Sequence, residues 1–247
     1  MNIALTETAH VELARAASEL SPALRQRLAH EWACAGQAQH ASTAAYGRFA
    51  LELLASDAPR GLVTGVHRAA LDEIRHAQRY FDLASIYERA TVVAQPVVLD
   101  AHTLSRLDLQ RAVYTAVIDG CVGETLAAVE AAHASSLSQW RTLRALLATI
   151  AHEESAHASL AFRFISWAID KHGSSLRSTA RDAFETAAAR VRALPLPQPD
   201  PQARTVLAHG RLCARERHVL RLRALDQLVA PLAHELCPRR PQSSVPS

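Results

Sequence analysis

The chain has 247 residues, of which 49% are apolar and only 5% aromatic, and its formal net charge is +3. The abundance of Ala, Leu and Arg favours helix over sheet, and the length is enough for one domain with a well-buried core. A charge this small demands no polyanionic partner, so nucleic acid is not an expected partner. Four widely spaced cysteines form no C-x-x-C pair and no long apolar run occurs, so we expect a cytoplasmic protein without a membrane partner.

Helical periodicity predicts an all-α protein with four long helices at its centre. We expect a four-helix bundle, with extra helices at both ends of the chain. An N-terminal helical segment is expected over residues 1–20, and the bundle over residues 21–173. Its helices are expected over about 21–56, 62–89, 107–137 and 139–172, with the first beginning at Ser21-Pro22, where serine can cap and proline suits the first turn.

Residues 91–106 contain a proline and lack a helical stripe. In extended form they are long enough to return along the whole bundle, which predicts a long crossover between helices two and three, the arrangement of a ferritin-like four-helix bundle. Residues 174–237 are expected to form C-terminal helices packed on the bundle. These comprise a helix over 174–194, a proline-rich linker and one long helix over about 203–236, and residues 238–247 are expected to be a disordered tail.

Two Glu-x-x-His pairs lie on inward-facing helical stripes, Glu73 with His76 and Glu154 with His157. Residues three apart lie on the same face of a helix, so each pair can reach a single point. Buried acids are costly unless they are paired or bind a metal ion. The pairs Glu7/His10 and Glu130/His133 lie outside these stripes, and we interpret them as surface coincidences.

In each expected pair of antiparallel helices, two central polar residues lie equally far from the connecting turn. Glu124 and Glu154 are equally far from residue 139, in the turn expected between helices three and four. Gln39 and Glu73 are centred on residue 56, beside the break expected between helices one and two. Antiparallel neighbours meet at equal distances from their turn, so these residues can converge on one site.

These stretches resemble the bacterial ferritin-like domain proteins of the di-iron carboxylate superfamily and, more remotely, the di-iron oxidases and N-oxygenases of specialised metabolism. The likeness covers roughly residues 25–170 and is carried by 70–77, 120–125 and 150–158. It implies that Glu73, His76, Glu124, Glu154 and His157 are metal ligands, with two iron ions as cofactors and O₂ as cosubstrate. The implied activity is an O₂-activating oxidase or oxygenase that acts on a small molecule, with an electron donor and a homodimeric partner as open questions.

Helix one departs from the family pattern, because Gln39 stands where a glutamate is expected. A neutral amide oxygen is a poorer ligand for a hard cation, and the site loses one negative charge. The neighbouring His40 is an alternative ligand, and its nitrogen would favour later transition metals. The sequence therefore leaves open a pair of metal ions, a single ion such as iron or manganese, and no metal at all.

Several residues near the expected ligands can be interpreted either as functional or as structural. Tyr46 and Tyr80 lie on the ligand faces and are candidate catalytic residues, although packing as core aromatics is the simpler alternative. Gly120 and Gly123 indicate either a local widening of helix three or close helix packing. Asp72 and Glu153 each precede a ligand glutamate and are candidates to orient a histidine, unless they face solvent.

Two other functions stay open at this point. The amide at residue 39 would suit a non-enzymatic bundle that has lost full metal binding and serves as a binding or structural protein. Metal storage or peroxide detoxification is the other alternative, but the helices expected after residue 173 would obstruct a cage-like assembly.

Overall fold

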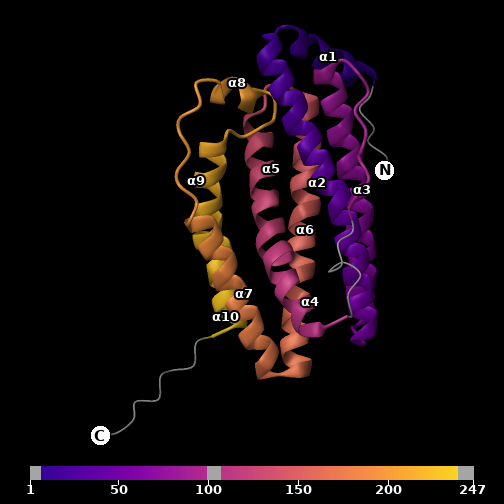
Figure 1. Ribbon diagram of the computed structural model, residues 1–247, viewed down its shortest axis with the longest axis vertical. Helices are drawn as coiled ribbons and strands as arrows, with labels where there is room; N and C mark the ends of the chain where they lie inside the picture. Colours follow the sequence, from indigo (N-terminus) through magenta and orange to yellow (C-terminus); the bar gives the residue numbers. More distant parts are fainter. Residues whose placement is uncertain (1–6, 99–106, 239–247) are drawn as a thin grey trace, which may run out of the picture.

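The computed structural model describes residues 7–98 and 107–238, and within these ranges every regular element is a helix, as the sequence predicted (Figure 1). The elements are α1 (Glu7–Ser18), α2 (Pro22–Ala55), α3 (Arg60–Glu88), α4 (Leu109–Thr115), η1 (Ala116–Glu124), α5 (Thr125–Leu137), α6 (Arg141–His172), α7 (Ser174–Arg192), α8 (Ala203–Ala208), α9 (Ala214–Ala224), η2 (Leu225–Val229) and α10 (Ala230–Leu236).

Local signals in the sequence account for the ends of the long helices. The Ser21 hydroxyl accepts a hydrogen bond from the backbone N–H of Leu24, and Pro22 occupies the first turn of α2. Asp57 adopts a positive φ of 54° in the turn before α3, and Arg89 ends α3 in the left-handed conformation. The predicted break between the first two long helices and the predicted end of the second are therefore confirmed.

Four long helical rods lie side by side at the centre of the molecule (Figure 1). Two are α2 and α3, which pack as a hairpin along their lengths. The others are the continuous α4–η1–α5 and its hairpin partner α6. The two hairpins meet chiefly where α3 packs on α6, whereas α2 makes few close contacts with α4.

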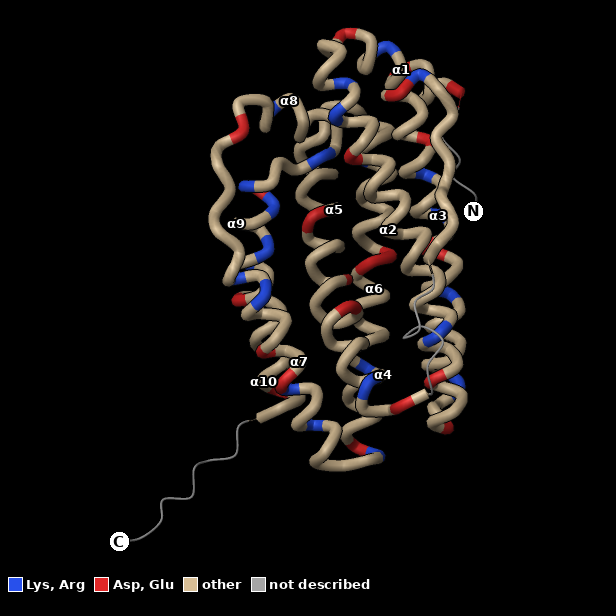
Figure 2. Tube along the Cα trace, viewed as in Figure 1, with Lys and Arg blue, Asp and Glu red and all other residues tan. Residues whose placement is uncertain are grey.

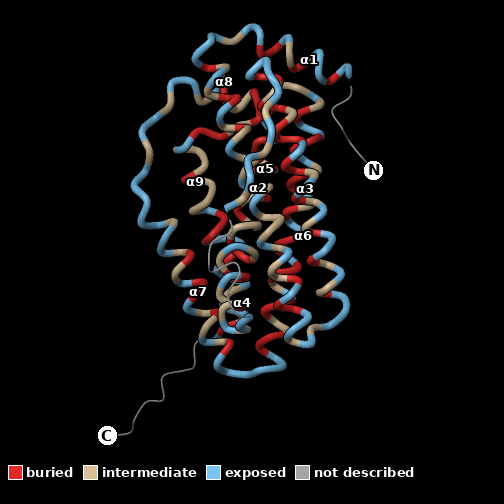
Figure 3. Tube along the Cα trace, turned by 45° about the vertical axis from the view of Figure 1, so that its right-hand side comes forward, coloured by how far each residue is buried: buried red, intermediate tan, exposed pale blue. Residues whose placement is uncertain are grey.

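The interior is divided into two apolar clusters, one above the other, with polar residues between them. Along α3, residues 62–69 join one cluster and residues 80–87 the other, so that Glu73 and His76 lie between. Along α6 the same division leaves Glu154 and His157 in the gap. Figure 3 shows the buried faces of these helices turned toward one another. The predicted inward stripes of α3 and α6 are thus confirmed.

The third rod is not a regular α-helix along its whole length. Its central nine residues, Ala116–Glu124, form a π-helix, a local widening that the sequence had left as one of two alternatives. A π-helix holds more than 3.6 residues per turn, and Cys121 and Val122 are buried within it. Over Leu109–Leu137 this rod is also long and apolar enough to cross a membrane by length and composition, and it is the only such helix among the described residues. Its packing against α6 and α7 gives a sufficient reason for that composition.

Residues 91–98 follow α3 without regular structure and lie along α2. The Gln37 side chain bonds to the backbone of Gln95 in both directions, accepting from its N–H at 2.9 Å and donating to its carbonyl at 3.0 Å. The rest of the predicted crossover, residues 99–106, lies outside the described residues, as do residues 1–6 and the predicted tail from 239 onward.

The prediction of one long helix over 203–236 was wrong. The segment is divided into α8, a turn, and the run from α9 through η2 to α10. Gly210 in the turn has a φ of 79°, and a Cβ there would lie 2.8 Å from Leu143. Cys213 then begins α9 through a capping box with Glu216. Glycine is therefore needed at residue 210 both for its backbone and for space.

The basic residues of this C-terminal part are visible along α9 in Figure 2. They are not a purely solvated face. Arg217 and Arg221 both form ion pairs with Glu130 of α5, and the Arg211 guanidinium lies 4.7 Å from the centre of the Trp32 ring. These contacts tie the C-terminal helices to α5 and α2.

Candidate metal centre

The residues between the two apolar clusters form one compact carboxylate-rich group. Ligand atoms of Glu73, Glu124, Glu154 and His157 all lie within 4.8 Å of one another. Glu73 comes from α3, Glu124 from the last residue of η1, and the other two from α6. Glu73 is 0% and Glu154 1% exposed, so water does not compensate their charges. The predicted convergence of three helices on one point is therefore present in the structure.

His76 completes this group on the side of α3. Its Nδ1 atom lies 3.4 Å from Glu154 Oε1 and 3.7 Å from Glu73 Oε1. The His157 Nδ1 atom lies 3.1 Å from Glu154 Oε2 and 3.2 Å from Glu73 Oε1. Both imidazoles therefore turn the same nitrogen toward the carboxylates.

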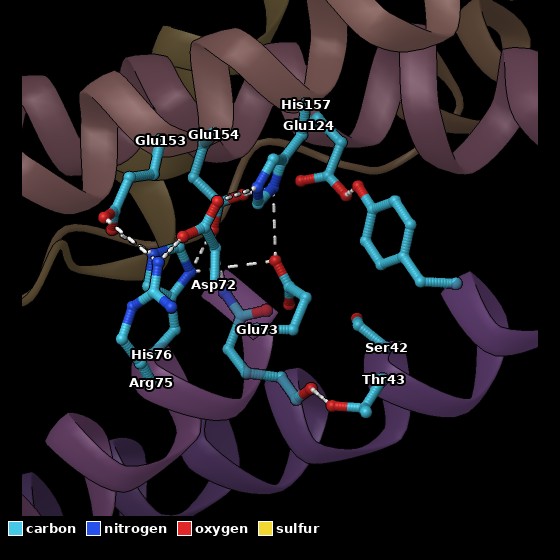
Figure 4. A network of polar contacts seen from close by, with 12 residues as sticks. Ser42, Thr43, Asp72, Glu73, Arg75, His76, Glu124, Glu153, Glu154 and His157 are labelled. Atoms are coloured by element: carbon cyan, nitrogen blue, oxygen red, sulfur yellow. Dashed lines mark hydrogen bonds and ion pairs between the residues drawn. The ribbon is translucent and has the colours of Figure 1, made fainter. Parts of the chain in front are cut away.

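The other nitrogen of each histidine meets an acid from the opposite helix (Figure 4). His76 Nε2 lies 2.7 Å from Glu153 Oε2, and His157 Nε2 lies 3.3 Å from Asp72 Oδ2. Glu153 also contacts Arg79 at 3.4 Å, and Asp72 pairs with Arg75. Asp72 and Glu153 thus hold the two rings in place across the α3–α6 interface, as the sequence suggested.

Of the two alternative ligands on α2, it is Gln39 and not His40 that contacts the carboxylates. The Gln39 side-chain amide donates a hydrogen bond to Glu154 Oε1 at 2.9 Å. His40 is not a member of the ligand group. Gln39 therefore occupies the position where a fourth carboxylate was expected, but it presents its amide donor to the cluster.

The two candidate tyrosines occupy different environments. The Tyr46 hydroxyl donates to Glu124 Oε1 at 2.7 Å, and its ring lies 5.6 Å from that of His157. Tyr80 is buried in one apolar cluster, where its ring lies 5.3 Å from that of Trp32. Of the two, Tyr46 has a direct contact with the site, and Tyr80 packs as a core aromatic.

The pKa values of the group are shifted because several acids lie close together away from water. Burial and repulsion from Glu154 raise the pKa of Glu124 well above its usual range. Burial also disfavours the charged form of Glu154, but its close contacts with the His157 and His76 nitrogens outweigh burial and hold the pKa of Glu154 low. Burial likewise opposes protonation of His157, yet Glu154 and Glu73 raise its pKa to about 10. Without a cation, the histidines balance part of the negative charge.

The carboxylate oxygens and imidazole nitrogens of this group are suited to bind a cation. Both carboxylate oxygens of Glu73 and the Nδ1 atom of His76 are buried and have no partner with hydrogen-bond geometry. Such atoms are costly to bury unless something coordinates them. Carboxylates and imidazoles from facing helices are the ligands of dinuclear iron and manganese centres in helical bundles. The described residues therefore suit one or two divalent transition-metal ions.

The π-helix brings Glu124 and the groove beside it into place. A Cβ at Gly120 would lie 2.6 Å from the Cβ of Ala161, so η1 approaches α6 closely there. At Gly123 the nearest atom to such a Cβ would be a backbone oxygen of η1 itself, at 3.4 Å. Both interpretations of these glycines therefore apply, because the helix is widened and is also closely packed.

A cavity of about 780 Å³ lies between α2 and the α4–η1–α5 rod, where these two rods are separated. Gln39, Tyr46, Glu124 and His157 line its inner end. Alanine is the commonest residue of its walls, and exposed residues of α2 such as Ala41 and Ala45 open it to solvent as a groove. Other residues that line it are Arg48, Glu52, Val97, Arg111, Asp119 and Leu160.

The sequence did not predict this groove, because its lining residues are mostly small and lie on different helices. The two discarded Glu-x-x-His pairs lie outside the site. Glu7 and His10 are exposed on α1, and Glu130 binds the arginines of α9.

Comparisons with protein-family models, curated proteins and solved structures found no significant match for this chain. The resemblance to ferritin-like proteins thus stays a prediction from the sequence.

Proposed function

We propose that this protein is a ferritin-like, metal-dependent oxidoreductase that uses O₂ to oxidise a small molecule, as bacterial enzymes of specialised metabolism do. The observation that carries the proposal is the buried group formed by Glu73, Glu124, Glu154 and His157, with His76 beside it. Three acids at one buried point serve no evident packing purpose, and a pair of iron ions would balance their charge. Manganese, or a single ion, is the alternative cofactor.

Iron held in such a group supplies O₂-activating chemistry that amino-acid side chains lack. The chain's own residues would hold and shield that centre. Glu153 and Asp72 orient the imidazoles, and the Tyr46 hydroxyl positions the Glu124 carboxylate. Apolar residues above and below the group exclude water.

The groove gives a small-molecule substrate access to the group. Its volume falls within the range of ligand pockets, and its lining combines small apolar residues with a few polar groups, as small-molecule sites do. At the lower end Arg48 and Glu52 form an ion pair with a distance of 2.8 Å. The reaction would also need an electron donor. A cytoplasmic location and a homodimeric state remain expectations from the sequence.

A non-enzymatic bundle is the second candidate, and the observation that favours it is the amide at Gln39 in place of a carboxylate. Metal storage is less favoured, because α7 and α9 pack along the outer side of the third rod, where subunits of a cage would need to meet.

Anaerobic loading with iron(II), followed by measurement of bound iron and of O₂ uptake, tests the proposal. We expect at least one tightly bound equivalent and O₂ consumption that increases with a suitable substrate. Glu154→Gln is the control, because it keeps the shape of the side chain and removes the central charge. Native protein that binds less than one equivalent and consumes no O₂ would exclude the proposed function.

A further inference from the structure

The two histidines divide the centre into two halves with different donors. The two oxygens of Glu154 point to different sides, Oε1 toward His76 Nδ1 and Oε2 toward His157 Nδ1. Glu73 Oε1 lies between the two rings. Glu73 and Glu154 are therefore common to two adjacent cation positions, which we call the His76 position and the His157 position.

The two positions differ in the residue that each has for itself. The His157 position has Glu124, whose carboxylate belongs to the compact ligand group. The His76 position has Gln39, whose amide donates to Glu154 Oε1, the oxygen on the His76 side. One position is thus bounded by three carboxylates. The other is bounded by two common carboxylates and a neutral amide.

We infer that the centre holds two unequal metal positions, of which the His157 position fills first and the His76 position binds weakly because of Gln39. The inference rests on the proposed metal binding. Affinity for a hard cation rises with the number of charged oxygens around it. A cation in the His76 position must also compete with the Gln39 amide for Glu154 Oε1.

The position that fills first is also the one that a substrate would meet. Glu124 and His157 line the groove, whereas His76 and Glu73 do not and are both 0% exposed. Gln39 lies at the boundary between the groove and the weaker position. The unequal affinities would therefore keep an ion beside the groove even when the second position is empty.

Manganese(II) tests this inference without relying on activity, because bound ions can be counted and their magnetic coupling read by electron paramagnetic resonance. We expect native protein to retain one equivalent after dialysis, with the spectrum of an isolated ion. Gln39→Glu should retain two equivalents with a coupled spectrum, through a gain of about tenfold or more in affinity for the second ion. Gln78→Glu is the matched control, since it adds the same charge at an exposed site on α3.

Two further variants assign the positions. Glu124→Gln should lose the first ion, whereas His76→Gln should keep it, and circular dichroism would confirm that both remain helical. Two equivalents of equal affinity in native protein would overturn the inference and leave the proposed function intact, as would a Gln39→Glu protein that behaves like Gln78→Glu. No manganese in native protein or in either glutamate variant would overturn both.

Discussion

The α3–α6 pair and the α2–η1 pair contribute to the centre in different ways. The first pair is nearly symmetric, because Asp72, Glu73 and His76 on α3 match Glu153, Glu154 and His157 on α6 in spacing. Each histidine contacts the outer acid of the other helix. In the second pair, Gln39 of α2 and Glu124 of η1 face the common carboxylates, and these two residues differ in charge. The symmetric pair provides a scaffold, and the other pair makes its two halves unequal.

The largest expected difference between the pairs is in the stability of the metal-free protein. Glu154 faces two histidines and is 1% exposed, so Glu154→Gln should lower the free energy of unfolding by about 3 kcal/mol. Glu124 accepts its hydrogen bond from the neutral Tyr46 hydroxyl and is repelled by Glu154. Glu124→Gln keeps an acceptor for the Tyr46 hydroxyl and should leave stability unchanged or higher.

Urea unfolding in the presence of a chelator measures both values. If the two variants lost equal stability, the α3–α6 pair would not differ from the α2–η1 pair in the way proposed. Both substitutions should nevertheless weaken manganese binding, since each removes a charged ligand.

The helices and the scaffold residues were predictable because they depend on local signals. Spacing alone placed Glu73 and His76 on one face, and the turn positions set Glu73 level with Gln39 and Glu124 level with Glu154. The outer acids followed from their place beside the ligands. These features require only helical geometry and hairpin symmetry.

What could not be predicted depends on contacts between distant segments. The sequence could not decide between widening and close packing at Gly120, because the close approach of this residue to Ala161 joins two separate helices. The division of 203–236 depends on Gly210 against Leu143, and a single glycine in a helical pattern is only weak evidence of a break. The donor orientation of Gln39 follows from its contact with Glu154, so residue identity alone does not give it.

A substitution that disturbs the packing of η1 on α6 should change the free energy of unfolding by an intermediate amount. Gly120→Ala would place a methyl group 2.6 Å from the Ala161 Cβ, and neither atom can rotate away. We expect a loss of about 1–3 kcal/mol from overpacking. Gly47→Ala on α2 is the matched control, because nothing lies within 4 Å of its added Cβ, and it should gain about 0.5–1 kcal/mol.

Thermal or urea unfolding of the two glycine variants compares the irregular rod with a regular one. If Gly120→Ala were as stable as Gly47→Ala, the close approach of η1 to α6 would be wrong, and with it the basis for the placement of Glu124.

The smallest expected effects concern the outer acids, where the symmetric pair can be tested against itself. Glu153→Gln and Asp72→Asn remove the charged partner of one histidine each and should weaken manganese binding by about 10- to 100-fold. The His76–Glu153 distance is 2.7 Å, and that between His157 and Asp72 is 3.3 Å. Since the shorter contact is the stronger one, Glu153→Gln should have the larger effect on its own position.

The effects of the two substitutions can be measured separately, because each should act on a different metal position. Glu153→Gln acts through His76 and should affect chiefly the second, weaker ion, so its effect is best measured in the Gln39→Glu background, where both ions are retained. Asp72→Asn acts through His157 and should affect the first ion even in native protein. Asp170→Asn, which removes an exposed acid from the far end of α6, should change neither. If both outer acids affected the same ion, each histidine could not belong to a separate position, and the centre would behave as a single site.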